Sequence, residues 1–64
     1  MERSKIGKKL ISLRNGRSSN TIANELRISP SALRMYEAGL RVPRDDIKIR
    51  IAKFYGENVE DIFF

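Results

Sequence analysis

The sequence contains no cysteine and no histidine. Without cysteine, no disulfide or thiolate metal site can reinforce the fold. Without histidine, the chain lacks the usual catalytic proton carrier and the most frequent metal-binding side chain. No apolar run approaches the roughly 20 residues that cross a bilayer, and no uninterrupted apolar segment follows residues 1–5. We therefore expect a cytoplasmic protein that has no signal peptide, membrane segment, metal or cofactor.

The chain is also short, which limits what it can enclose. The chain has 64 residues, and we expect it to form one domain over residues 1–64. A domain of this size buries only about 60% of the surface that its unfolded chain exposes. Such a core leaves little room for a dry, preorganised pocket. We therefore expect no enzymatic activity and no small-molecule ligand, and an enzyme is the weakest function class that we consider.

Positive charge is abundant and unevenly distributed. The chain has 13 Lys and Arg against 8 Asp and Glu, a net charge of +5. Residues 1–50 hold 12 basic and 5 acidic side chains, whereas residues 51–64 hold one basic and three acidic side chains. A basic body with an acidic end favours a polyanionic partner that contacts one face, although a merely solvated basic surface remains the alternative.

Apolar residues recur at helical spacing in five segments, and no segment alternates as a strand does. The sequence therefore predicts an all-α fold of five short helices. The predicted helices begin at residue 2 or 4, 18 or 19, 30, 45 or 46, and 58, and they end near residues 15, 26 or 27, 38, 55 and 63.

Local signals mark the ends of these helices. Ser29 is a favourable N-cap, and Pro30 suits the first helical position because its missing N–H needs no partner there. Gly39 can end the third helix. We also expect a serine to cap the second helix, and Asn58 with Asp61 to form a capping box on the fifth.

The second and third predicted helices are separated by a short turn, Arg27 to Ser29. Two short helices with apolar inner faces and a three-residue turn make a helix-turn-helix, here about residues 18–38. In that motif the second helix enters the major groove of DNA.

The stretch SSNTIANELRISPSALRMYEAGLRVP, residues 18–43, resembles the Xre and Cro/CI-like helix-turn-helix regulators of bacteria and phages. IGKKLISLR before it resembles the first helix of this family, and IAKFYG and VEDIF resemble its last two helices. The resemblance implies a lambda-repressor-like domain. Two positions differ from the family: Arg27 replaces the usual glycine of the turn, and Ser19 replaces a glutamine.

The resemblance implies which residues contact DNA. Arg34 is expected to contact guanine through two hydrogen bonds, with a solvated helix residue as the alternative. Pro30 is either a base contact or only a helix starter, and Met35 either contacts the groove or packs within the protein. The base-contacting set is Pro30, Ser31, Arg34 and Met35. The set expected at phosphates, with plain surface charge as the alternative for its arginines and lysines, is Ser19, Arg41, Arg44, Lys8, Lys9 and Arg17.

The resemblance also implies a structural ion pair between Arg14 and Glu37, which are far apart in the sequence. As a partly buried pair it would orient the third helix against the first. The alternative is a surface pair, which would contribute less than about 1 kcal/mol.

The C-terminal end is rich in apolar side chains, and one small core cannot bury all of them. Exposed apolar patches often mark protein contacts, and Ile49 also lies off its helix's apolar stripe. We expect a homodimer on a palindromic operator, with Phe63 folding back onto the core of a monomer as the alternative. The predicted interface is Val59, Ile62, Phe63 and Phe64.

The function that these observations favour is sequence-specific binding of double-stranded DNA by a small transcriptional regulator, a repressor. An antitoxin that binds its own operator fits equally well. A protein-interaction module with the same fold is the alternative of a different class. The resemblance places the protein in a bacterium or phage, at the nucleoid.

Overall fold

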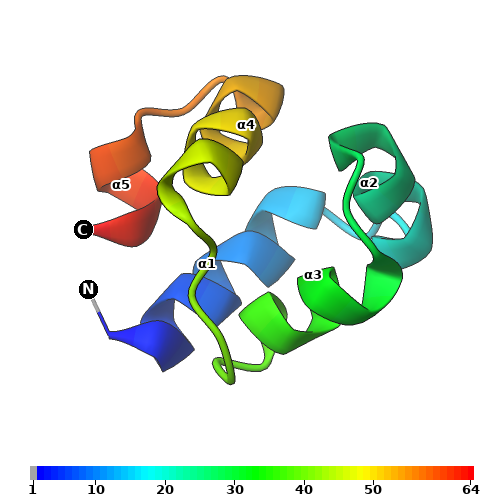
Figure 1. Cartoon of the computed structure of the whole chain (residues 1–64), viewed down its shortest axis with the longest axis horizontal. Helices are drawn as coiled ribbons and strands as arrows, with labels where there is room; N and C mark the ends of the chain where they lie inside the picture. The colour runs from blue at the N-terminus through cyan, green and yellow to red at the C-terminus, as the bar shows by residue number, and fades with distance from the viewer. Residues whose placement is uncertain (1) are drawn as a thin grey trace.

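The computed structural model describes residues 2–64, which form five helices and, within that range, no strand. The all-α prediction is confirmed. Figure 1 shows α2 and α3 side by side, with α4 and α5 on the opposite side of α1 from α3. No helix in residues 2–64 has the length and apolar content that crossing a membrane requires. The bounds are Arg3–Arg14 (α1), Ser19–Leu26 (α2), Pro30–Glu37 (α3), Asp45–Tyr55 (α4) and Val59–Phe63 (α5).

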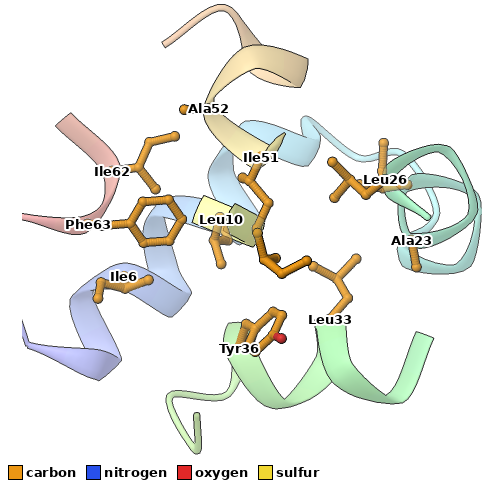
Figure 2. Packing of buried hydrophobic residues seen from close by; sticks show 12 residues of the cluster. Ile6, Leu10, Ala23, Leu26, Leu33, Tyr36, Ile51, Ala52, Ile62 and Phe63 are labelled. Atoms are coloured by element: carbon orange, nitrogen blue, oxygen red, sulfur yellow. The ribbon is translucent and has the colours of Figure 1, made fainter. Parts of the chain in front are cut away.

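One apolar core lies where the five helices meet (Figure 2). Helix α3 packs against α1 and α2, and α4 packs against α2 and α5, while α5 also contacts α1. Every helix contributes at least two buried side chains, so each depends on its neighbours for stability. The buried apolar residues are Ile6, Leu10, Ile22, Ala23, Leu26, Leu33, Tyr36, Ile47, Ile51, Ala52, Ile62 and Phe63.

The start of α3 follows the sequence signals, because Ser29 Oγ accepts a hydrogen bond from the Ala32 N–H at 3.0 Å and Pro30 is the first helical residue. Two other predicted caps are wrong. Ser18 is the N-cap of α2, but its hydroxyl makes no capping hydrogen bond.

The predicted capping box on α5 is also absent. Asn58 is the N-cap residue but caps no N–H group, and its Nδ2 instead lies 3.5 Å from Asp61 Oδ2. A capping box needs a Glu or Gln at the third helical position to reach back to the N-cap N–H. Asp61 is one methylene shorter, so the reciprocal bond does not form.

The C-terminal helix supplies the main correction. Ile62 and Phe63 are 0% and 2% exposed and lie inside the core, as Figure 2 shows. Assigning these two side chains to a surface contact is therefore wrong, because α5 turns them toward α1 and α4. Phe64 stays on the surface with 63% exposure, and Val59 is half-buried.

Helix α1 approaches α3 closely at Gly7. A Cβ atom at this position would overlap the carbonyl oxygen of Glu37 and lie 3.1 Å from the carbonyl oxygen of Tyr36. Both atoms belong to the α3 backbone, which cannot move aside without shifting the helix. The missing side chain of Gly7 therefore sets the distance between α1 and α3.

Candidate nucleic-acid interface

The turn between α2 and α3 is fixed by backbone hydrogen bonds. Arg27 adopts a left-handed conformation with φ of 61°. Its N–H donates to Asn24 O at 3.2 Å, and the Ile28 N–H donates to Ala23 O at 3.0 Å. These two bonds form a Schellman motif, which ends α2 and turns the chain toward α3. The motif therefore forms with arginine at the position where the family usually has glycine.

Arg50 of α4 supports the same turn. Its Nη1 donates to the carbonyl oxygen of Leu26 at 3.0 Å and lies 3.4 Å from that of Arg27. The last carbonyl groups of a helix have no partner within the helix and carry partial negative charge. The Arg50 guanidinium therefore satisfies the end of α2 and ties it to α4.

Helix α3 has one buried and one outward face. Leu33 and Tyr36 lie in the core, and at 100° per residue the opposite side holds residues 31, 34 and 38. Ser31, Arg34 and Ala38 are exposed, while Pro30 and Met35 at the edges of this face are partly buried. All four residues predicted at DNA bases therefore lie at the start or on the outward side of α3.

Arg34 is the charged residue of this outward face. Its Nη1 lies 3.4 Å from Asn20 Oδ1 in α2, and its Nη2 lies 3.4 Å from Ser31 Oγ. Both distances are long for hydrogen bonds, and the side chain is exposed. The guanidinium is thus directed along the outward side toward α2 while its donors remain accessible to a ligand.

Helix α2 begins with open N–H groups. Its first residue, Ser19, is partly buried, and the N-cap residue Ser18 makes no side-chain capping hydrogen bond. The first N–H groups of a helix have no partner within the helix, and the helix dipole makes them attractive to anions. The geometry at Ser19 therefore suits an anionic oxygen.

Four arginines line a hollow on another side of α3. Its volume is about 460 Å³. The side chains come from the α2–α3 turn (Arg27), the α3–α4 connection (Arg41 and Arg44) and α4 (Arg50). Its apolar walls are formed by Ile28, Ala32, Tyr36, Val42 and Ile47.

The arginine hollow, as we call this site, is strongly positive. Arginine keeps its charge at any physiological pH. Asp46 Oδ1 lies 3.4 Å from Arg44 Nε, but the two side chains are 61% and 81% exposed, so water screens the pair. Planar guanidinium groups match the oxygens of phosphate. The hollow can therefore bind a phosphate group.

Arg27 and Arg50 were not among the residues predicted at phosphates. The sequence distinguishes Arg27 only as the residue at the usual glycine position of the turn. No sequence pattern around Arg50 indicates a phosphate contact. The two residues are 23 positions apart, and only the packing of α4 against α2 brings them to the same hollow as Arg41 and Arg44.

The remaining basic residues of the predicted set lie outside the hollow. Lys8 and Lys9 are on α1, exposed and partly buried respectively. The Arg17 guanidinium lies 5.9 Å from the Phe54 ring centre and 6.0 Å from that of Tyr55. These are cation–π distances, so Arg17 has a packing role that the sequence did not indicate. Burial raises the pKa of the Tyr55 phenol, with Arg17 acting in the opposite direction.

The ion pair implied by the resemblance is present. Arg14 Nε lies 2.6 Å from Glu37 Oε2, and the two side chains are 21% and 7% exposed. Arg14 also donates through Nη1 to the carbonyl oxygen of Arg17 at 3.0 Å. The pair joins the end of α1 to the end of α3 and, with Gly7, sets the orientation of α3.

A helix-turn-helix of the DNA-binding class is therefore defined by the open start of α2, the fixed turn and the outward face of α3. A family model described as helix-turn-helix matches residues 9–62. The chain belongs to this Xre and Cro/CI-type helix-turn-helix family, which is a family of DNA-binding regulatory domains. No curated protein and no solved structure matches the chain.

Proposed function

We propose that the chain recognises a specific sequence in double-stranded DNA and represses transcription. The observation that carries this proposal is the position of Arg34 on the outward face of α3, with the start of α2 and the arginine hollow on different sides of that helix. The major groove is about 12 Å wide and accepts one helix. With α3 in the groove, the start of α2 and the arginine hollow both face phosphates.

The contacts divide into two kinds, because phosphate contacts position a protein and base contacts specify the sequence. Pro30, Ser31, Arg34 and Met35 are proposed at base edges. Ser19, Arg41 and Arg44 are proposed at phosphates, and we add Arg27 and Arg50 because they line the same hollow. Lys8, Lys9 and Arg17 lie outside it, and we propose them only as contributors to the positive field.

We further propose that two chains bind a palindromic operator as a homodimer. Ile49 is 48% and Phe64 63% exposed, and the two line a hollow of about 340 Å³ with Val59, Lys48 and Asp45. The corrected interface is therefore Ile49, Val59 and Phe64. Two-fold symmetry would place the two α3 helices about 34 Å apart, on successive turns of the groove.

The test is a fluorescence titration of the protein with an operator selected from a random DNA pool, at several salt concentrations. We expect Arg34→Ala to relax the sequence preference. Arg44→Ala is expected to weaken binding to all sequences and to reduce the slope of log K against log salt by about 1, since one phosphate contact is lost.

Lys53→Ala provides the matched control. It removes one exposed charge from α4 at a position that lies outside the arginine hollow and away from the outward face of α3, so the salt slope should stay unchanged. The base-reading assignment is wrong if Arg34→Ala keeps the preference of the wild-type protein. Flat salt dependence, or no binding at low salt, would instead favour the protein-interaction module.

A further inference from the structure

The outward face of α3 is polar at one end and apolar at the other. A shallow hollow of about 390 Å³ lies there, lined by Ser31, Arg34, Met35, Ala38 and Leu40. Leu40 is 68% exposed, the highest value among the large apolar residues of the described chain. We call this the leucine hollow. Leu40 does not contribute to the core, so its position beside Arg34 suggests that it contacts a ligand.

The backbone holds Leu40 against the end of α3. Gly39 has a φ of 75°, its N–H donates to Tyr36 O at 3.2 Å, and the Leu40 N–H donates to Met35 O at 2.9 Å. This is again a Schellman motif, in which the residue after the glycine contacts the side chain five positions earlier. Leu40 is therefore a fixed continuation of the outward face, next to Met35.

The major groove offers one apolar group at base edges, the C5-methyl of thymine. The Arg34 guanidinium at the rim of the same hollow has the donor geometry that guanine O6 and N7 require. We propose that the leucine hollow receives the methyl group of a thymine next to the guanine that Arg34 contacts. This proposal rests on the proposed function, and it predicts adjacent guanine and thymine in each half-site.

Positive charge favours DNA over an apolar protein segment as the occupant. Arg34 is part of the hollow itself, the chain carries a net charge of +5, and the surface continues into the proposed interface through Ser31. An apolar peptide would offer the Arg34 guanidinium no acceptor beyond the long contacts to Asn20 and Ser31. A thymine methyl fills the apolar end while base oxygens and nitrogens accept hydrogen bonds at the polar end.

The test replaces each thymine of the selected operator by deoxyuridine, one at a time, which removes only the methyl group. For the wild-type protein we expect about a fourfold loss of affinity at one thymine per half-site, as for one methyl group taken from an apolar contact. Leu40→Ala should bind the thymine and uracil operators equally. Ile11→Ala, which shortens an exposed residue of α1, should keep the wild-type ratio.

Different results overturn different claims. If no single uracil weakens wild-type binding, or if the selected half-site contains no thymine, the methyl contact is refuted while the proposed function stands. If Leu40→Ala keeps the fourfold ratio, the methyl is bound elsewhere and the leucine hollow is not its site. If selection yields no preferred sequence and binding is insensitive to salt, the proposed function fails as well.

Discussion

Arg27 combines a backbone conformation that is unfavourable for stability with a side chain that we propose binds phosphate. Its φ of 61° is a conformation that glycine adopts without steric strain, and that costs other residues about 1–2 kcal/mol. Gly39 and Gly56 occupy the equivalent position in the other two Schellman motifs of residues 2–64. Arg27 differs from both because its side chain lines the arginine hollow.

We therefore expect Arg27→Gly to change stability and DNA binding in opposite directions. Relief of the backbone strain, reduced by the greater freedom of glycine in the unfolded chain, should stabilise the fold by about 0.5–1 kcal/mol. In a domain of this size that raises the Tm by about 4–7 °C. Affinity for DNA should fall, because one positive charge is lost from the hollow.

Arg27→Ala separates these two effects. Alanine keeps the strain of the left-handed conformation but removes the charge, so it should lower DNA affinity as glycine does without raising the Tm. Thermal unfolding by circular dichroism and DNA titration measure the two quantities. An unchanged or lower Tm for Arg27→Gly would show that the Arg27 side chain stabilises the turn more than its backbone destabilises it.

At the scale of elements, α1 acts as the support on which α3 rests. Gly7 permits the close approach of the two helices, and the Arg14–Glu37 pair holds their ends together. The resemblance implied the ion pair, but the sequence did not predict the close packing at Gly7. A glycine within a helical pattern does not indicate which segment packs against it. The direction in which α3 projects follows from these contacts.

Gly7→Ala is expected to destabilise the fold by about 2–3 kcal/mol, as in other overpacked sites. The added Cβ meets rigid α3 backbone rather than a side chain that can move. Since a domain this small has few kcal/mol of stability in total, the urea midpoint should fall sharply. Ser12→Ala, an exposed change in the same helix, should leave the midpoint almost unchanged. Equal midpoints for Gly7→Ala and the wild-type protein would contradict the close packing.

At the scale of the whole molecule, the C-terminal half combines apolar surface with a fixed cation. Lys48 Nζ lies 4.7 Å from the Phe64 ring centre and 3.7 Å from Asp45 Oδ1. Its side chain is only 13% exposed, so it holds the last residue against α4. Phe64 and Ile49 therefore line one hollow with Val59, and this is the surface that we propose for contact with a second chain.

We expect Ile49→Ser to weaken dimerisation and to abolish cooperative binding to a palindromic operator. The side chain is 48% exposed, so the fold should be retained while apolar area is lost from the interface. Analytical ultracentrifugation measures the mass, and Ile11→Ser, which changes a residue of 46% exposure on α1, is the control. A wild-type protein that stays monomeric at high concentration, and binds half-sites independently, would contradict the dimer.

The sequence by itself determined the number of helices, their positions to within a few residues, and the identity of the turn. These depend on local signals, namely apolar spacing, Ser29-Pro30 and the glycines at helix ends. The resemblance to the family implied that Arg34 faces DNA, and the structure places Arg34 on the outward side of α3.

Only the tertiary structure decided which apolar residues are available to a partner and which basic residues lie together. Ile62 and Phe63 are consumed by the core whereas Phe64 is not, a difference that depends on how α5 docks on α1 and α4. Arg50 reaches Arg27, and Leu40 extends α3, through contacts that the sequence pattern did not indicate. Periodicity gives the side of a helix on which a residue lies, but what faces that side depends on packing between distant segments.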